Sequence, residues 1–165
     1  MSGGARFPIP DIVRRRAVSE GEPGLAWLAS LDVTLAGLEH DWNVAIGPAY
    51  PGGTAAFVAE ATAGNGDVFI VKVSTPATGA GRNEADVLRL AGGKGYVRLI
   101  RHDPARCAML LEKLGDRLDS LALPYQQQID IMCATLLQAW MPVPEGAAYT
   151  NGADKANGLA EAMIR

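Results

Sequence analysis

One hairpin constrains the fold of this chain more than any other feature of its sequence. The tetrapeptide Gly64-Asn65-Gly66-Asp67 lies between two runs of strand-forming residues, 54–62 and 68–73. Asn and Gly tolerate the positive φ angles of tight hairpin turns, so the two runs are predicted to pair as antiparallel strands. Residues 68–73 are apolar or β-branched on both faces, apart from one lysine, which is typical of a central strand.

The hydrophobic pattern changes on both sides of this hairpin. Leucines spaced three and four residues apart predict an amphipathic helix that begins at Pro23, after an irregular arm with one short helix around 11–16. The alternation of Trp42, Val44 and Ile46 predicts a strand before the hairpin. The same rules predict these later elements: a helix at 83–91, strands at 97–101 and 107–114 with a turn at Asp103-Pro104, a helix from Pro124 to about 141, and the start of a helix at 154–165.

Composition limits the possible partners. The 165 residues are 48% hydrophobic and 20% charged, which suits one globular domain or one lobe of a larger one. A net charge of −3 argues against nucleic acid or an anionic membrane as the main partner. No apolar run approaches the roughly 20 residues of a membrane span, and the start does not resemble a signal peptide. The two cysteines and two histidines have no metal-ligand spacing, so we predict a cytoplasmic protein without a metal site in this chain.

Two charged residues stand on faces that otherwise favour burial. Lys72 alternates with Val68 and Ile70 in the apolar strand, and Glu84 shares a helical face with Leu88. A buried unpaired ion costs several kcal/mol in order of magnitude, so the two are predicted to approach within salt-bridge distance. The alternative is that Lys72 reaches solvent at a sheet edge while Glu84 occupies the exposed first turn of its helix.

The order of these elements is that of a protein-kinase-type N-lobe. The chain has, in this order, a glycine-containing turn, a strand, a hairpin, a strand that carries Lys72, a helix that carries Glu84, and a strand ending in LLEKLG. The chain resembles the N-terminal part of the streptomycin and hydroxyurea phosphotransferase family, a branch of the aminoglycoside kinase-like enzymes, over residues 41–146. Five segments carry the resemblance: DWNVAIGPAYPGGTAAFVAEA, GDVFIVKVSTP, NEADVLRLAGGKGYVRLIRHD, CAMLLEKLGDRLDS and LLQAWMPVP.

The resemblance implies an α+β fold, namely a kinase-like N-lobe with a five-stranded antiparallel sheet and one packed helix. Helices flank this lobe at both ends of the chain. The expected divisions are an N-terminal arm and helix at 1–40, a nucleotide-binding lobe at 41–115, and a helical segment at 116–165. The last segment is expected to be the start of a C-lobe before which the chain is truncated.

The resemblance also assigns roles to individual residues. Lys72 would bind the α- and β-phosphates of ATP, and Glu84 would orient it. Glu112 and Leu114 would form the hinge, presenting backbone groups to the adenine edge. Gly52 and Gly53 would lie where the kinase glycine loop covers the phosphates, although the G-x-G-x-x-G pattern is absent. For Asp116, Asp119 and Ser120 a turn and capping role is favoured over a contact with ribose.

The activity implied is transfer of phosphate from ATP to an alcohol group of a small molecule, such as a streptomycin-type antibiotic. Mg²⁺ ligands and the catalytic aspartate are expected in the missing C-lobe, so no catalytic residue is assigned and this chain alone is expected to be inactive. Arg101-His102-Asp103 does not qualify as a catalytic loop, because no asparagine follows at the required spacing. The alternative is a noncatalytic binding module that kept the N-lobe fold.

The helix predicted at 125–141 carries an apolar stripe. Its members recur at steps of three and four residues: Ile129, Met132, Cys133, Leu136, Leu137 and Trp140. Such a stripe needs cover, either from residues 142–165 folded back or from a second copy of the chain. We predict the second arrangement, a homodimer through this helix.

Overall fold

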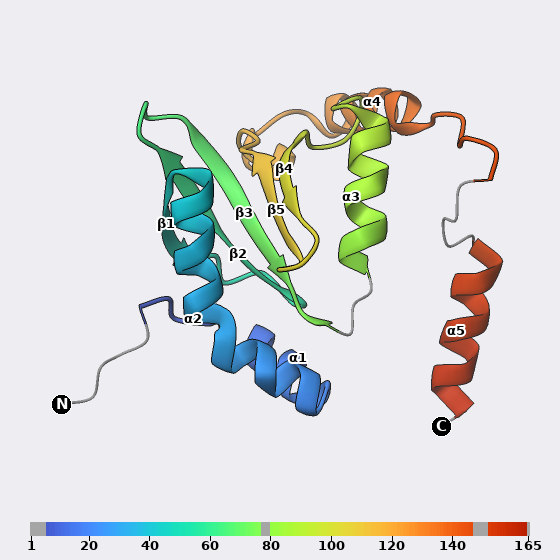
Figure 1. Cartoon of the computed structure of the whole chain (residues 1–165). Helices are drawn as coiled ribbons and strands as arrows, with labels where there is room; N and C mark the ends of the chain where they lie inside the picture. Colours follow the sequence, from blue (N-terminus) through green and yellow to red (C-terminus); the bar gives the residue numbers. More distant parts are fainter. Residues whose placement is uncertain (1–5, 77–79, 147–151, 165) are drawn as a thin grey trace.

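Five antiparallel strands form one sheet in the order β1-β2-β3-β5-β4. The computed structural model describes residues 6–76, 80–146 and 152–164. The strands are β1 (Val44–Ala49), β2 (Ala56–Ala63), β3 (Val68–Ser74), β4 (Leu99–Asp103) and β5 (Ala108–Glu112). Together with the helices in Figure 1 they make an α+β fold, which confirms the predicted class and the five-stranded antiparallel sheet.

The β2–β3 hairpin is confirmed at the predicted turn. The strands pair from Thr62 opposite Val68 to Ala56 opposite Ser74. Gly66 has a φ of 90°, and the Asn65 side chain accepts a hydrogen bond from the Asp67 amide at 3.1 Å. β3 lies at the centre of the sheet, between β2 and β5, as its apolar character predicts.

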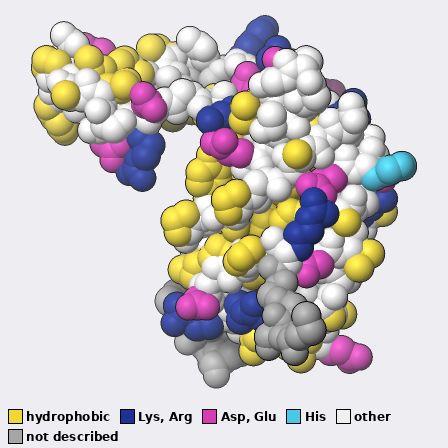
Figure 2. Space-filling view, turned by 90° about the vertical axis from the view of Figure 1, so that its left-hand side faces the viewer, with side chains coloured by type: hydrophobic (Ala, Val, Ile, Leu, Met, Phe, Trp, Pro, Cys, Tyr) yellow, Lys and Arg dark blue, Asp and Glu magenta, His cyan; other side chains and the backbone are white. Residues whose placement is uncertain are grey.

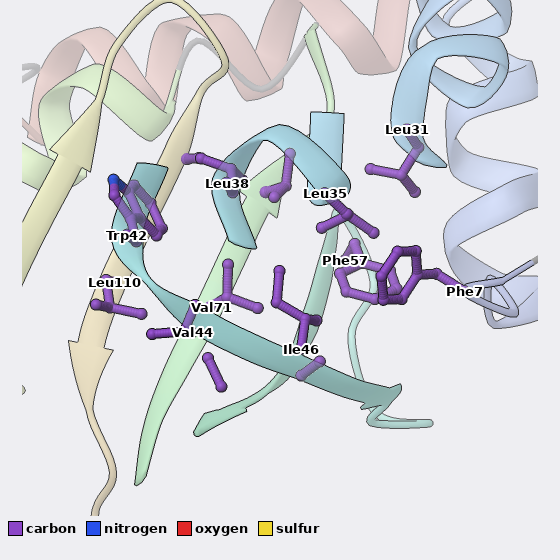
Figure 3. Close-up of a cluster of buried hydrophobic side chains, with 14 residues drawn as sticks. Phe7, Leu31, Leu35, Leu38, Trp42, Val44, Ile46, Phe57, Val71 and Leu110 are labelled. Atoms are coloured by element: carbon purple, nitrogen blue, oxygen red, sulfur yellow. The ribbon is translucent and has the colours of Figure 1, made fainter. Parts of the chain in front are cut away.

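One face of the sheet is covered by helix α2 (Glu22–Trp42), and helix α1 (Asp11–Ser19) packs against α2 below the sheet (Figure 1). Leu31, Leu35 and Leu38 of α2 are almost fully buried against the sheet, as Figure 3 shows. Phe7 meets Phe57 edge to face, with ring centroids 6.2 Å apart. Because each such side chain stabilises the fold by about 1.5–3 kcal/mol when fully buried, this cluster is the main core of the molecule.

The other face is covered only in part, by α3 (Ala80–Ala91). Ala85 and Leu88 of this helix pack on Met109 and Leu111 of β5. Alternation along β3 sends Val71 and Val73 to the α2 side, while Ile70 contacts the cluster on the α3 side. The sheet therefore has helices on both faces, whereas the sequence predicted one packed helix.

Several predicted boundaries are wrong by a few residues. Trp42 is the last residue of α2 and not a strand residue, because Asn43 adopts a left-handed conformation with φ 53° and ends the helix there. The fourth and fifth strands begin later than predicted, at Leu99 and Ala108. The fifth cannot include Cys107, whose φ of 50° is incompatible with a strand. Leu25 of the predicted stripe is 53% exposed.

Helices α4 (Tyr125–Ala139) and α5 (Gly152–Ile164) follow the short 3-10 helix η2 (Leu118–Ser120). α4 has no buried residue. It contacts the loop after α3 at Gly95, where an added Cβ would lie 2.5 Å from the Ala139 nitrogen. The predicted apolar stripe is largely exposed, with Leu137 at 68% and Trp140 at 75%. The described part of residues 142–165 therefore does not bury it.

Candidate functional site

The Lys72–Glu84 ion pair is the centre of the candidate site. Lys72 Nζ lies 2.7 Å from both Glu84 carboxylate oxygens. The side chains are 26% and 33% exposed, so the pair is shielded but still open to a ligand. The predicted approach of the two residues is confirmed, and the alternative of two separate solvent-exposed charges is excluded.

The two side chains of this pair are positioned by a strand and a helix. Lys72 lies in central β3, where it is opposite Val58 on one side and Met109 on the other. Glu84 extends from α3, which is fixed to β5 through Ala85 and Leu88. A helix packed on one strand and a lysine on the neighbouring strand bring the two charges together across 12 residues of sequence.

A cleft of about 690 Å³ lies on the same face of the sheet. We call it the hinge cleft; its lining residues are Tyr50, Glu60, Ile70, Val97, Leu111, Glu112, Lys113, Leu114, Gly115, Asp116 and Arg117. Ile70 lies two residues before Lys72 on β3, so the cleft and the ion pair are neighbours on one strand face. Figure 2 shows a hollow with hydrophobic side chains beneath a projecting arm, and charges of both signs interspersed around it. The volume falls within the usual range of small-molecule sites.

Glu112 and Leu114 border this cleft where β5 ends. The Glu112 carboxylate accepts a hydrogen bond from the Arg98 amide at 2.7 Å, so its side chain is held beside β4. Leu114 is 62% exposed. Among the residues described, no hydrogen-bond partner is present for the Leu114 amide. The predicted hinge residues thus lie at the cleft, and the backbone, not the Glu112 carboxylate, is the group that can meet a ligand.

The two glycines of the turn at 50–54, here called the glycine turn, differ in their surroundings. A Cβ at Gly53 would lie 2.8 Å from the Ala56 carbonyl oxygen and 3.8 Å from Val58 Cγ2. Val58 is the register partner of Lys72, so Gly53 lies near the ion pair. A Cβ at Gly52 would meet nothing within 4 Å. Gly53 is therefore required by close packing, while Gly52 has no such requirement.

Sequence reasoning missed a second charged group at the cleft. Glu60 accepts a hydrogen bond from the Tyr50 hydroxyl at 2.6 Å and from Lys113 Nζ at 2.7 Å. Lys113 and then Tyr50 lower the pKa of Glu60, and the same hydrogen bond raises the pKa of Tyr50. The group joins β2 to the segment after β5. The signal was present in the sequence, since Glu60 is the one charged residue in the run 54–62.

The other predicted candidates contribute less. Asp119 pairs with Arg117 at 2.6 Å, and the Ser120 hydroxyl donates to the Arg117 carbonyl, which supports the predicted turn and capping role. Asp116 lines the hinge cleft. Within the described ranges, no three His, Cys, Asp or Glu side chains are grouped as a metal site. A search of the same residues found no helix long and apolar enough to cross a membrane.

Two known proteins are similar to this chain in sequence. Over 149 residues the chain is 28% identical to streptomycin 6-kinase of Streptomyces glaucescens, covering 88% of this chain. Over 119 residues it is 31% identical to streptomycin 6-kinase of Streptomyces griseus, covering 69% of this chain. The chain is related to the streptomycin kinases. The resemblance to the streptomycin phosphotransferase family is thereby confirmed.

The chain spans less than half the length of either streptomycin kinase. The chain spans 47% of the Streptomyces glaucescens enzyme and 37% of the Streptomyces griseus enzyme. No family model matches the chain, and no solved structure matches it either.

Proposed function

We propose that this chain is the nucleotide-binding part of an ATP-dependent phosphotransferase that acts on an alcohol group of a small molecule. Its sheet and α3 would form a kinase-like N-lobe. The observation that carries the proposal is the closed Lys72–Glu84 pair beside the hinge cleft. The kinase relatives make an aminoglycoside or a related compound the class of acceptor to test first.

The residues at the cleft suit a nucleotide. Ile70, Val97 and Leu111 offer an apolar slot for a base, and the free backbone after Glu112 offers polar groups for its edge. Lys72 would neutralise phosphate charge, and Glu84 would hold the ammonium in place. Gly53 would let the backbone of the glycine turn approach the phosphates.

Magnesium fits these residues less well. Beside Lys72 the carboxylate described is that of Glu84, which is engaged through both oxygens. Mg²⁺ needs several oxygen ligands in near-octahedral geometry. We therefore assign no metal ligand to this chain and propose that the ligands for Mg²⁺ belong to a C-lobe.

The proposal is tested by nucleotide binding. Titration calorimetry with ATP should give a Kd of about 0.1–1 mM, because the described residues group no metal ligands that could clamp the phosphates. Lys72→Met should weaken ATP binding roughly tenfold, since a charge-assisted contact is lost. Lys94→Met is the matched control, because Lys94 lies on the exposed loop after α3. Equal ATP affinity in both variants would contradict the assignment of Lys72.

A second measurement separates an enzyme part from a noncatalytic module. Incubated with γ-labelled ATP, Mg²⁺ and streptomycin, the chain alone should transfer no phosphate, because phosphoryl transfer depends on metal-assisted positioning. Activity should appear when a separately expressed C-lobe, taken from the parent reading frame, is added. A parent reading frame without a catalytic-loop motif would instead favour the binding module.

A further inference from the structure

A buried carboxylate joins the N-terminal helices to the end of β3. The Glu20 side chain is 3% exposed and pairs with Arg16 Nε at 3.0 Å. The Thr75 hydroxyl, 55 residues away in sequence, donates to Glu20 Oε1 at 2.7 Å. Thr75 is itself only 1% exposed. Burying a carboxylate is costly unless it is paired and hydrogen-bonded, so these contacts are needed to keep the charge inside the fold.

The corner between α1 and α2 fixes the position of Glu20. Glu20 is the C-cap of α1; its amide donates to the Ala17 carbonyl at 3.0 Å, and the Gly21 amide donates to the Val18 carbonyl at 3.1 Å. A Cβ at Gly24 would lie 1.8 Å from the Ala17 carbonyl oxygen, so the two helices meet too closely for any other residue there. The tight corner therefore fixes the backbone from which the Glu20 side chain extends, while Arg16 and Thr75 hold the carboxylate itself.

Thr75 connects this corner to two segments of the candidate site. It lies three residues beyond Lys72, and its amide donates to the Ala55 carbonyl at 3.1 Å, directly after the glycine turn. On the other side of the turn, a Cβ at Gly53 would lie 3.8 Å from Val13 Cγ2 of α1. In Figure 1, α1 lies below the sheet, where β2 begins and β3 ends. α1 thus contacts the glycine turn directly and the end of the lysine strand through Glu20.

We propose that Glu20 and Thr75 are positioning residues for the phosphate end of the nucleotide site. The inference rests on the proposed function. The Glu20–Thr75 contact fixes the glycine turn relative to Lys72, so it supports binding of the phosphates and not of the base. Neither Glu20 nor Thr75 lines the hinge cleft, which would hold the base.

The test uses an isosteric pair of substitutions in the whole chain. Thr75→Val removes the hydroxyl and keeps the shape, while Thr75→Ser keeps the hydroxyl. ATP affinity is measured by calorimetry and adenosine affinity by ligand-observed NMR. Thr75→Val should weaken ATP binding about fivefold and leave adenosine binding within about twofold, whereas Thr75→Ser should match the wild type. A change in fold stability alone would weaken both ligands together.

Amide hydrogen exchange, measured without nucleotide, tests the positioning role independently of ATP affinity. Amide hydrogen exchange at residues 53–57 should be faster in Thr75→Val than in Thr75→Ser. Glu20→Asp, which keeps the charge but is one methylene shorter, should behave like Thr75→Val. It takes the place of Thr75→Val in both measurements if that variant does not fold.

Three results would overturn the inference. These are unchanged ATP affinity in Thr75→Val, equal weakening of ATP and adenosine, and unchanged exchange at 53–57. If the wild-type chain binds no ATP, the proposed function fails first and the positioning role fails with it. Wild-type binding together with an unaffected Thr75→Val contradicts the positioning role alone.

Discussion

His102 is a single residue whose protonation affects the stability of the fold. Its Nδ1 accepts a hydrogen bond from Arg89 Nη2 at 2.5 Å, which ties β4 to α3. Burial, and then the positive charge of Arg89, lower the pKa of His102 below its usual value. The folded protein therefore binds this proton less readily than the unfolded chain does.

This difference predicts a loss of stability in acid. As pH falls through the unfolded value of about 6.5, the unfolded chain gains a proton before the folded one, and the free energy of unfolding decreases. His102→Asn keeps an acceptor for Arg89 but cannot titrate, so its stability should fall less between about pH 7.5 and pH 5.5. Urea unfolding at the two pH values measures the difference. Identical decreases in wild type and variant would show that His102 does not contribute.

At the residue scale, the sequence identifies charged residues that stand on otherwise apolar faces and therefore need a partner. Lys72 and Glu84 could be paired in advance because each stands on an apolar face and a mutual ion pair satisfies both charges. Glu60 shows the same signal, yet its partners Tyr50 and Lys113 could not be predicted, since they come from a strand end and from the segment after β5. Glu20 gives no signal at all, because its burial depends on the packing of α1 against the sheet.

At the element scale, α4 depends on one glycine outside it. Gly95 has a φ of 68°, and a Cβ there would lie 2.5 Å from the Ala139 nitrogen and 2.7 Å from the Thr135 carbonyl oxygen. Both atoms belong to the α4 backbone, which cannot yield by a change of rotamer. The contact therefore holds the C-terminal half of α4 against the loop that follows α3.

Gly95→Ala should loosen α4. Gly92→Ala is the matched control, because Gly92 also has a positive φ, 56°, but a Cβ there would meet nothing within 4 Å. Both substitutions carry the left-handed strain of roughly 1–2 kcal/mol, and only Gly95→Ala adds the clash. Hydrogen exchange in residues 125–139 should accelerate in Gly95→Ala alone. Equal acceleration in both variants would show that backbone strain, and not the α4 contact, is responsible.

The elements that could be predicted are those specified locally. The β2–β3 hairpin is encoded by four consecutive turn residues, and central β3 by its apolar composition. The predicted start of the fifth strand was wrong because a cysteine with positive φ, here Cys107, carries no clear sequence signal. The end of α2 was wrong although Asn43 is of a residue type that tolerates positive φ. The coverage of a second sheet face by α2 was missed, since the leucine pattern shows that a helix is amphipathic but not which surface it meets.

At the scale of the whole molecule, the exposed stripe of α4 predicts self-association. Cover by residues 142–165 is not seen in the described structure, which leaves a second copy as the predicted partner. Several apolar side chains removed from water would stabilise a symmetric pair by several kcal/mol in order of magnitude. Light scattering at micromolar concentration should therefore report a dimer.

Substitutions on two helices test this prediction. Leu137→Lys should give a monomer, since Leu137 is 68% exposed on the stripe of α4. Val33→Lys is the control, because Val33 is 77% exposed on α2, and this variant should remain dimeric. A monomeric wild type, or dimers in both variants, would contradict an interface through α4.

One face of β2 and β3 packs in the main core and the opposite face lines the hinge cleft, so substitutions on the two faces have different effects. Phe57, Ala59 and Val71 point into the main core, while Glu60 and Ile70 line the hinge cleft. A complete mutational scan of the two strands should thus give tolerance with a period of two residues. Folding would be sensitive at one set of positions and ligand preference at the other. Drift along the cleft face could change what is recognised while the folded state is inherited unaltered.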